Sequence, residues 1–368
     1  MRLTTLPARL LDLACAIQQI PAPTFHEQAR AEFVRRQFAT LNLQDIEVDD
    51  LGNVYARRPG YGSPLARPLL ITAHTDTVFP IDTPLTLTRT QDRIAGPGIG
   101  DNSLGVAGLL GLLWALEGET LPGDLWLVAN VGEEGLGDLR GMRRVMERLG
   151  ERVRATIVIE GMSLGHVYHS AIGVRRYRFT ARAEGGHSWL HFGQPSAIHA
   201  LMRLGAKIAD VQVPASPKTT FNIGTIIGGT SINTIAREAS MDVDLRSESP
   251  AQLSGLAAQI EALATNAESG VTIETLIIGE RPAGGIPREH PLVQLAARVL
   301  ADEGLTPTFE TGSTDANIPL SRSLPCVVMG LTRGANAHRP DEYIETVHVE
   351  KGLNALTALV RGVWGIMI

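Results

Sequence analysis

Three largely apolar runs constrain the fold of this chain more than any other feature of its sequence. They are residues 69–73, 124–131 and 155–159. Such runs are typical of strands that are buried on both faces, as in parallel sheets. The segments 103–116 and 139–149 predict helices between them. Strands that alternate with helices indicate βαβ units, so we expect an α/β domain with a mostly parallel mixed sheet and helices on both faces.

The pattern changes near residue 172, which predicts a second domain in this chain of 368 residues. Polar and apolar residues alternate at 176–183, and further strands and two helices follow before a Gly/Pro-rich exit near 281–285. This block resembles an inserted split-βαβ, ferredoxin-like α+β domain. We therefore expect a discontinuous catalytic domain of residues 1–171 and 284–368. Residues 172–283 would form a lid or dimerisation domain.

Composition excludes several classes of protein. The formal net charge of −6 gives no reason to expect a nucleic-acid or anionic-membrane partner. No run approaches the roughly 18 apolar residues of a membrane span, and Arg9 and Asp12 interrupt the N-terminal apolar stretch, so no signal peptide is expected. Cys15 and Cys326 form neither a disulfide framework nor a thiolate metal site. We expect a cytoplasmic protein.

Histidines and carboxylates recur where the apolar runs end or in the loops that follow. They are His74, Asp101, Glu133, Glu134, Glu160 and His338. In open α/β sheets, ligands bind beyond the carboxyl ends of the strands. Mixed imidazole and carboxylate ligands suit Zn²⁺, with Co²⁺ or Mn²⁺ as substitutes. This set is too large for one catalytic ion with an open position, but it suffices for two ions that share a bridging carboxylate.

The adjacent residues Glu133 and Glu134 can have two different chemical roles. At a strand end, consecutive side chains point to opposite sides. One carboxylate can then bind metal while the other acts as the base toward the attacking water. The alternative is that residues 132–137 form a solvated acidic turn with no chemical role.

The motifs as a set resemble one family over nearly the whole chain. They are residues 73–78 (Ala-His-Thr-Asp-Thr-Val), 100–102 (Gly-Asp-Asn), 133–135 (Glu-Glu-Gly), Glu160 and His338. The chain is similar to the co-catalytic zinc hydrolases of the aminoacylase, peptidase T, glutamate carboxypeptidase and succinyl-diaminopimelate desuccinylase family. The resemblance implies that His74 and Glu160 hold one Zn²⁺ and that Glu134 and His338 hold the other. Asp101 would bridge the two ions, with a cis peptide bond after it.

The same resemblance implies roles beyond metal binding. Glu133 would be the general acid/base, and Asp76 would fix the tautomer and orientation of His74. His187, in the segment Glu-Gly-Gly-His-Ser, would polarise the scissile carbonyl, often across a dimer. Residues near the carboxylate end of the substrate would be Asn233, Arg246, Gly312, Ser313 and Thr314. An Arg suits this task because its planar fork pairs with a carboxylate.

We expect hydrolysis of an amide bond in small substrates with a free carboxylate. Short peptides are the first expectation, because the 312–317 loop resembles the peptidase T branch. An N-acyl amino acid is the alternative, because deacylases of the family usually carry Glu where this chain has Glu160. Two further alternatives are a non-catalytic, metal-stabilised binding protein and a hydrolase with one ion. A homodimer through the inserted domain is also expected from the resemblance.

Overall fold

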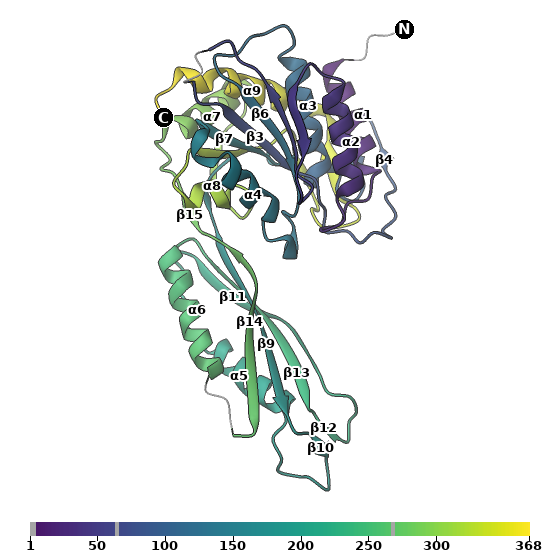
Figure 1. Cartoon of the computed structure of the whole chain (residues 1–368), viewed down its shortest axis with the longest axis vertical. Helices are drawn as coiled ribbons and strands as arrows, with labels where there is room; N and C mark the ends of the chain where they lie inside the picture. The colour runs from purple at the N-terminus through teal and green to yellow at the C-terminus, as the bar shows by residue number, and fades with distance from the viewer. Residues whose placement is uncertain (1–4, 63–65, 266–268) are drawn as a thin grey trace. The chain divides into compact units, whose positions relative to one another are not determined.

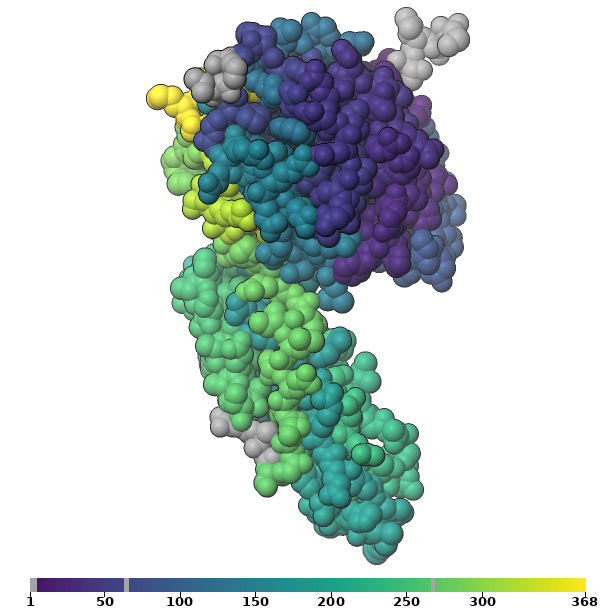
Figure 2. Space-filling model, viewed as in Figure 1, coloured from purple at the N-terminus to yellow at the C-terminus, as the bar shows by residue number. Residues whose placement is uncertain are grey.

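The computed structural model describes residues 5–62, 66–265 and 269–368. The chain divides into two compact units: unit 1 comprises Met1–Ala171 and Gly285–Ile368, and unit 2 comprises Ile172–Gly284. Figure 2 shows unit 1 in colours from both ends of the bar, purple to blue and light green to yellow, because segments from both ends of the chain pack in it. Unit 2 has only the intermediate teal and green colours.

The centre of unit 1 is a mixed sheet whose middle strands run parallel (Figure 1). The strand order is β1-β2-β6-β3-β7-β17-β8-β15, and β16 pairs with β8. The pairs β6–β3, β3–β7 and β7–β17 are parallel, whereas β1–β2, β2–β6 and β17–β8 are antiparallel. The strands are β1 Gln44–Val48, β2 Val54–Arg58, β3 Leu69–His74, β6 Leu125–Asn130, β7 Ala155–Ile159, β8 His166–Ala171, β15 Gly284–Gly285, β16 Thr308–Gly312 and β17 Cys326–Met329.

Helices cover both faces of this sheet. Along β3, successive side chains point to opposite faces. Leu69 and Ile71 pack in the larger core with α1, α3, α7 and α9, whereas Leu70 packs in a smaller core with α4 and α8. All of β3 is buried, as the largely apolar run predicted. The helices are α1 Leu6–Gln18, α2 Gln28–Ala39, α3 Gly105–Ala115, α4 Arg140–Arg148, α7 Pro291–Asp302, α8 Asn317–Ser321 and α9 Val349–Gly362.

A small antiparallel sheet in unit 1 was not expected from the sequence. Its order is β18-β19-β5-β4, with β4 Thr88–Arg89, β5 Arg93–Ala95, β18 Gly334–Ala335 and β19 Tyr343–Glu345. The pairing of β19 with β5 brings the chain that follows His338 beside the chain that leads to Asp101. Two of the predicted site residues, far apart in sequence, therefore lie on loops that this sheet joins.

Unit 2 is an antiparallel sheet with two helices, in the order β11-β13-β9-β14 (Figure 1). Along β13 the apolar residues, such as Met241 and Leu245, are buried against α5 and α6, and the residues between them are more exposed. This alternation matches a sheet with one covered face. The elements are β9 Gly173–Ala183, β10 Gly186–His187, α5 Ala197–Ala209, β11 Thr219–Gly228, β12 Thr234–Ile235, β13 Glu238–Ser247, α6 Pro250–Thr265 and β14 Val271–Arg281.

The predicted α/β class, with a mostly parallel central sheet and helices, is confirmed. The sequence predicts the hairpin of β1 and β2, but it did not indicate the antiparallel pairing of β2 with β6 or of β8 with β17. Among the described residues, no helix has the length and apolar character needed to span a membrane.

Candidate metal centre

The carboxyl ends of three adjacent strands meet at one edge of the unit 1 sheet. β3 ends with His74, β6 ends with Asn130 shortly before Glu133, and β7 ends with Ile159 directly before Glu160. Because β3 pairs parallel with both of its neighbours, these ends lie side by side. This edge is where an α/β sheet places ligand-binding residues.

A first group of possible ligand atoms comes from His74, Asp101 and Glu160. His74 Nε2 lies 3.1 Å from Asp101 Oδ1 and 3.7 Å from Glu160 Oε2. The other ring nitrogen, Nδ1, lies 3.2 Å from the backbone oxygen of Asp76. A proton on Nδ1 can be donated to that oxygen, and the lone pair of Nε2 then faces the two carboxylates.

A second group comes from Asp101, Glu134 and His338. His338 Nε2 lies 3.2 Å from Asp101 Oδ2 and 3.2 Å from Glu134 Oε1. In each of the two groups, one candidate ligand atom per residue lies within 4.8 Å of the others. Asp101 belongs to both groups, and its two carboxylate oxygens face different imidazoles.

The backbone around Asp101 is fixed by the next residue. The Asp101–Asn102 peptide bond is cis, as the resemblance implied. The Asn102 side chain donates to the backbone oxygen of Ile159 at 2.8 Å and accepts from the N–H of Gly161 at 3.0 Å, so it ties the loop to the end of β7. A Cβ on Gly105 would lie 1.9 Å from Asn102 Oδ1, so α3 can begin this close only with glycine.

Asp76 does more than the resemblance implied. Its fully buried carboxylate lies 3.5 Å from His74 Nδ1. It also accepts the backbone N–H groups of Glu133, on Oδ1, and of Glu134, on Oδ2, both at 2.9 Å. Asp76 therefore fixes the backbone that carries both glutamates, in addition to lying beside His74.

Two residues from the N-terminal segment complete this arrangement, and sequence analysis missed both. The Thr24 hydroxyl donates to Asp76 Oδ2 at 2.9 Å, across 52 positions of sequence. Arg30, which is 1% exposed, donates to the backbone oxygens of Thr75 at 2.8 Å and Ile20 at 2.7 Å. Burial lowers the pKa of Arg30 to about 10, although the charge of Asp76 acts in the opposite direction. No local pattern marks either residue as a partner of the segment that follows β3.

Glu133 and Glu134 do not diverge in the way that a strand end would make them. β6 stops at Asn130, and Gly132 has a φ of 67°, so the two glutamates lie on a turn. Both are buried, and each offers a carboxylate oxygen within 4.8 Å of a His74 ring nitrogen and of the other glutamate. The interpretation as a solvated acidic turn is therefore wrong.

The electrostatics of the cluster reflect carboxylates gathered around imidazoles. Burial raises the pKa of Asp101, but hydrogen bonds with His338 and His74 outweigh it and hold this pKa well below the usual range. Burial raises the pKa of Glu160 to about 7, and the charge of Asp101 adds to this effect. Contacts with Asp101 and Glu134 raise the pKa of His338 to about 10. The carboxylates thus attract positive charge strongly at this edge.

The residues present fit two divalent cations. Each of the two groups offers one imidazole and two carboxylates, which is a donor set typical of Zn²⁺ and compatible with Co²⁺ or Mn²⁺. A cation in either group would replace the proton that the carboxylates draw to the imidazole. Asp101 is common to the two groups and could serve both cations.

His187 lies in unit 2, on the short β10 strand that pairs with β12. Its ring Nδ1 accepts the backbone N–H of Trp189 at 3.2 Å. The neutral imidazole therefore carries its proton on Nε2, which makes that atom a hydrogen-bond donor. The backbone N–H of His187 donates to His191 Nδ1 at 2.9 Å, which fixes the turn.

The other predicted substrate residues lie on two separate parts of the chain. In unit 2, Asn233 accepts from the Ser231 hydroxyl at 3.0 Å, and Arg246 Nε donates to Asp244 Oδ2 at 2.7 Å. In unit 1, Gly312 ends β16, and Ser313 and Thr314 begin the turn to α8. The following residue, Asp315, accepts a hydrogen bond on Oδ2 from the Asn130 side chain at 2.7 Å, so this turn lies at the same sheet edge.

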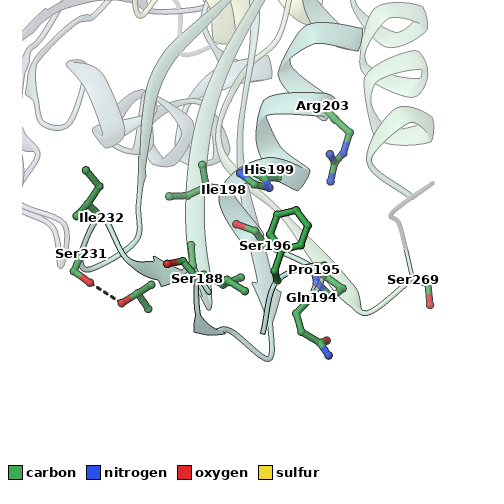
Figure 3. Close-up of a pocket in the computed structure, with 15 residues that line it drawn as sticks. Ser188, Gln194, Pro195, Ser196, Ile198, His199, Arg203, Ser231, Ile232 and Ser269 are labelled. Carbon is green, nitrogen blue, oxygen red and sulfur yellow. Dashed lines mark hydrogen bonds between the residues drawn. The ribbon is translucent and has the colours of Figure 1, made fainter. Parts of the chain in front are cut away.

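Unit 2 contains a cavity of about 960 Å³ (Figure 3). Its lining begins in sequence at Ser188, directly after His187. Its lining combines polar side chains with exposed apolar ones, and Phe192 and Ile232 are 91% and 103% exposed. Ser188 and Ser231 on its wall are neighbours of His187 and close to Asn233 in sequence. None of the six residues grouped around Asp101 and Glu133 lines this cavity.

The sheet edge and its two ligand groups are those of an α/β protein that can bind metal. Residues 70–362 match peptidase family M20/M25/M40, and the chain belongs to this family. The chain is a hydrolase of C–N bonds with a metal-binding site, as the family is.

Similar proteins fall on both sides of the peptide and N-acyl alternatives. A peptidase M20 domain-containing protein of Schizosaccharomyces pombe is 29% identical over 87% of this chain and 75% of its own length. An acetylornithine deacetylase of Erwinia tasmaniensis is 27% identical over 80% of this chain and 79% of its own. The crystal structure of a tripeptidase from Staphylococcus aureus subsp. aureus Mu50 superposes with a TM-score of 0.81 at 20% identity, covering 98% of this chain and 99% of that chain.

Proposed function

We propose that this chain hydrolyses an amide bond in small substrates with a free carboxylate, using two divalent ions that share Asp101. The observation that carries the proposal is that Asp101 directs one carboxylate oxygen to His74 and the other to His338. A carboxylate between two imidazoles, each with a further carboxylate beside it, suits a bridge between two cations.

We assign His74, Asp101 and Glu160 to one ion and Asp101, Glu134 and His338 to the other. Zn²⁺ is the proposed metal, with Co²⁺ or Mn²⁺ as substitutes, because the donors are imidazole nitrogens and carboxylate oxygens. When bound, two such ions polarise the scissile carbonyl and favour ionisation of the attacking water at neutral pH. Two equivalents per chain are expected on metal analysis, and about one at saturation would contradict the assignment.

Glu133 is proposed as the general acid/base. Its carboxylate lies beside His74 and Glu134, and its backbone is held by Asp76. It would take a proton from the attacking water and deliver it to the leaving nitrogen. His187 is proposed to donate its Nε2 proton to the carbonyl oxygen as negative charge develops there.

Asn233, Arg246, Gly312, Ser313 and Thr314 are proposed to bind the carboxylate end of the substrate. Arg246 uses Nε to bond Asp244, and the guanidinium has further N–H donors with which to pair a carboxylate. Backbone N–H groups of the turn after β16 can add to this pairing. Substrates in which the carboxylate is amidated are therefore expected to be poor.

Short peptides are the first candidate substrates and N-acyl amino acids the second. The turn after β16 and the fold shared with a tripeptidase agree with peptides. The sequence similarity to an acetylornithine deacetylase agrees with N-acyl amino acids, as does Glu160.

One experiment separates the two substrate classes. Metal-loaded protein is incubated with a pool of dipeptides, tripeptides, C-terminal glutamate conjugates, and N-acetyl and N-succinyl amino acids, beside the Glu133→Ala variant. Loss of peptides alone assigns a peptidase, and loss of N-acyl compounds alone assigns a deacylase. Two bound ions with no hydrolysis of any compound would instead support a binding protein that lacks catalysis.

A homodimer through unit 2 and a cytoplasmic location complete the proposal. Unit 2 exposes large apolar side chains near His187, among them Trp189 at 84% and Leu190 at 73%. Exposed apolar groups of this kind are typical of surfaces that bind a partner. Light scattering of the pure protein tests the dimer, and fractionation of the producing cells tests the location.

A further inference from the structure

Glu342 is a buried carboxylate that faces the loop before Asp101. The residue is fully buried. Its Oε1 accepts the backbone N–H groups of Gly100 at 2.7 Å and Asp101 at 2.9 Å, and its Oε2 accepts that of Gly98 at 3.3 Å. Its own backbone oxygen accepts the N–H of Gly96 at 2.8 Å. One residue thus holds four backbone groups of the loop that carries the proposed bridging ligand.

The same residue closes the loop that carries His338. The N–H of Glu342 donates to the backbone oxygen of Arg339 at 3.0 Å, and the N–H of Arg339 donates to that of Asn336 at 3.1 Å. Asn336 and His338 have φ values of 64° and 65°, in the left-handed region that few non-glycine residues adopt. The His338 side chain is 53% exposed, so packing alone does not fix its position.

We propose that Glu342 is a positioning residue, which sets the separation of Asp101 and His338 so that both can hold the same cation. The inference rests on the proposed two-ion function. Glu342 is joined to one ligand by a direct hydrogen bond and to the other by a turn of four residues. Losing its side-chain contacts would release the Asp101 loop from the turn that follows His338. Partners that orient metal ligands typically change metal affinity by 10–100-fold when they are mutated.

Asp49 provides a matched control within unit 1. Its Oδ1 accepts the backbone N–H groups of Leu51 at 3.0 Å, Gly52 at 3.0 Å and Asn53 at 2.9 Å, in the turn between β1 and β2. Like Glu342, it is a carboxylate that binds three N–H groups of one loop, but that loop carries no proposed metal ligand. Asp49→Asn therefore measures how much the weakening of such hydrogen bonds lowers the stability of the fold when the loop carries no proposed metal ligand.

The test compares Glu342→Gln, Glu342→Asp and Asp49→Asn with the parent full-length protein. Each is stripped with a chelator and titrated with Co²⁺ alone, and the affinity of each equivalent and the visible spectrum are recorded beside urea unfolding. We expect Glu342→Gln to weaken at least one equivalent by about 10–100-fold and to change the Co²⁺ spectrum. Asp49→Asn should lower stability and leave both Co²⁺ affinities within about twofold of the parent.

A loss of less than about fivefold in the Co²⁺ affinities of folded Glu342→Gln, with an unchanged spectrum, would overturn the inference and leave Glu342 a structural residue. If Glu342→Gln does not fold, the same threshold applies to Glu342→Asp, which keeps the charge on a shorter side chain. A parent protein that binds two Co²⁺ ions but hydrolyses no amide contradicts the proposed function and not the role of Glu342. A parent that binds only one ion contradicts both.

Discussion

The two units of this protein differ in how deeply they bury their candidate functional residues, although His338 of unit 1 is itself 53% exposed. In unit 1, His74 and Asp76 are 1% and 0% exposed, at the end of a strand whose residues are all buried. In unit 2, His187 is exposed at the end of the short strand β10, and the side chain of Arg246 is 44% exposed on the open face of its sheet. One set is fixed by a core, and the other is fixed mainly by local hydrogen bonds.

The difference follows from the type of sheet. A parallel sheet covered on both faces leaves its chemistry at the strand ends, where neighbouring ends meet and side chains are buried. An antiparallel sheet with one covered face leaves alternate residues in solvent along the whole strand. We therefore expect mutations in unit 1 to affect metal binding and turnover, and mutations in unit 2 to affect interactions that form only with substrate.

Glu133→Ala should give the largest effect and tests the chemical role of unit 1. Removing the general base is expected to lower kcat by about 10²–10⁴-fold with the metal content unchanged. Steady-state kinetics and metal analysis of the same preparation measure both quantities. Glu134→Ala is the contrasting variant, because loss of a proposed ligand should lower metal content as well. Activity of Glu133→Ala within tenfold of the parent would refute the assignment.

His187→Ala tests whether an exposed residue of unit 2 takes part in the chemical step. Loss of one donor to the developing oxyanion is expected to lower kcat by about 10²–10³-fold. Metal content should stay at the parent level, because His187 belongs to neither ligand group. His199→Ala, on the exposed surface of α5, is the matched control and should have little effect. A His187→Ala protein with reduced metal content would contradict the expectation that mutations in unit 2 leave metal binding unchanged.

Arg246→Ala should act on substrate binding alone. A hydrogen-bonded charge pair is typically worth about 1.5–3 kcal/mol, which corresponds to a rise in KM of about 10–100-fold for substrates with a free carboxylate. Arg178 is a suitable control, because it pairs with Asp242 at 2.8 Å on a neighbouring strand and has no proposed role. Equal losses for free and amidated substrates would remove Arg246 from the recognition site.

Much of unit 1 could be predicted from sequence because its signals are local. The apolar run of β3 predicts a buried strand, and the runs before Glu133 and Glu160 predict that these acids follow strands β6 and β7, which lie on either side of β3. The turn that brings Glu133 and Glu134 together was also marked in the sequence, by Gly132, whose φ of 67° suits glycine. The structure differs there because β6 ends two residues before that turn.

The residues that hold the site in place could not be predicted in the same way. Thr24 reaches Asp76 across 52 positions, and Glu342 reaches Gly100 across 242 positions. Each is one polar side chain that bonds a distant strand end or loop, and such a contact leaves no periodicity or spacing in the sequence. The pairing of β19 with β5 brings Glu342 next to its partners, and three-residue strands give too short a pattern to predict.

Tyr177→Phe should give the smallest effect and tests unit 2 apart from any substrate. Tyr177 is buried in the core of this unit, and its hydroxyl donates to Glu261. Burial and this carboxylate raise the pKa of Tyr177 to about 12 from an ordinary value near 10. The neutral hydroxyl thus stabilises the fold fully below about pH 10, and this contribution is lost as the pH rises toward 12. We expect the variant to be about 1 kcal/mol less stable than the parent at neutral pH.

Urea unfolding of parent and variant between pH 8 and pH 12 measures this difference. The parent should lose its advantage over Tyr177→Phe between about pH 10 and pH 12, because only the parent has this hydroxyl to ionise. The kcat for amide hydrolysis and the metal content should be the same in the parent and in Tyr177→Phe, since the Tyr177 ring packs within the core of unit 2. A constant difference in stability across that range would show that Tyr177 titrates equally in the folded and unfolded chains, and a change in metal content would show that the units do not divide their roles.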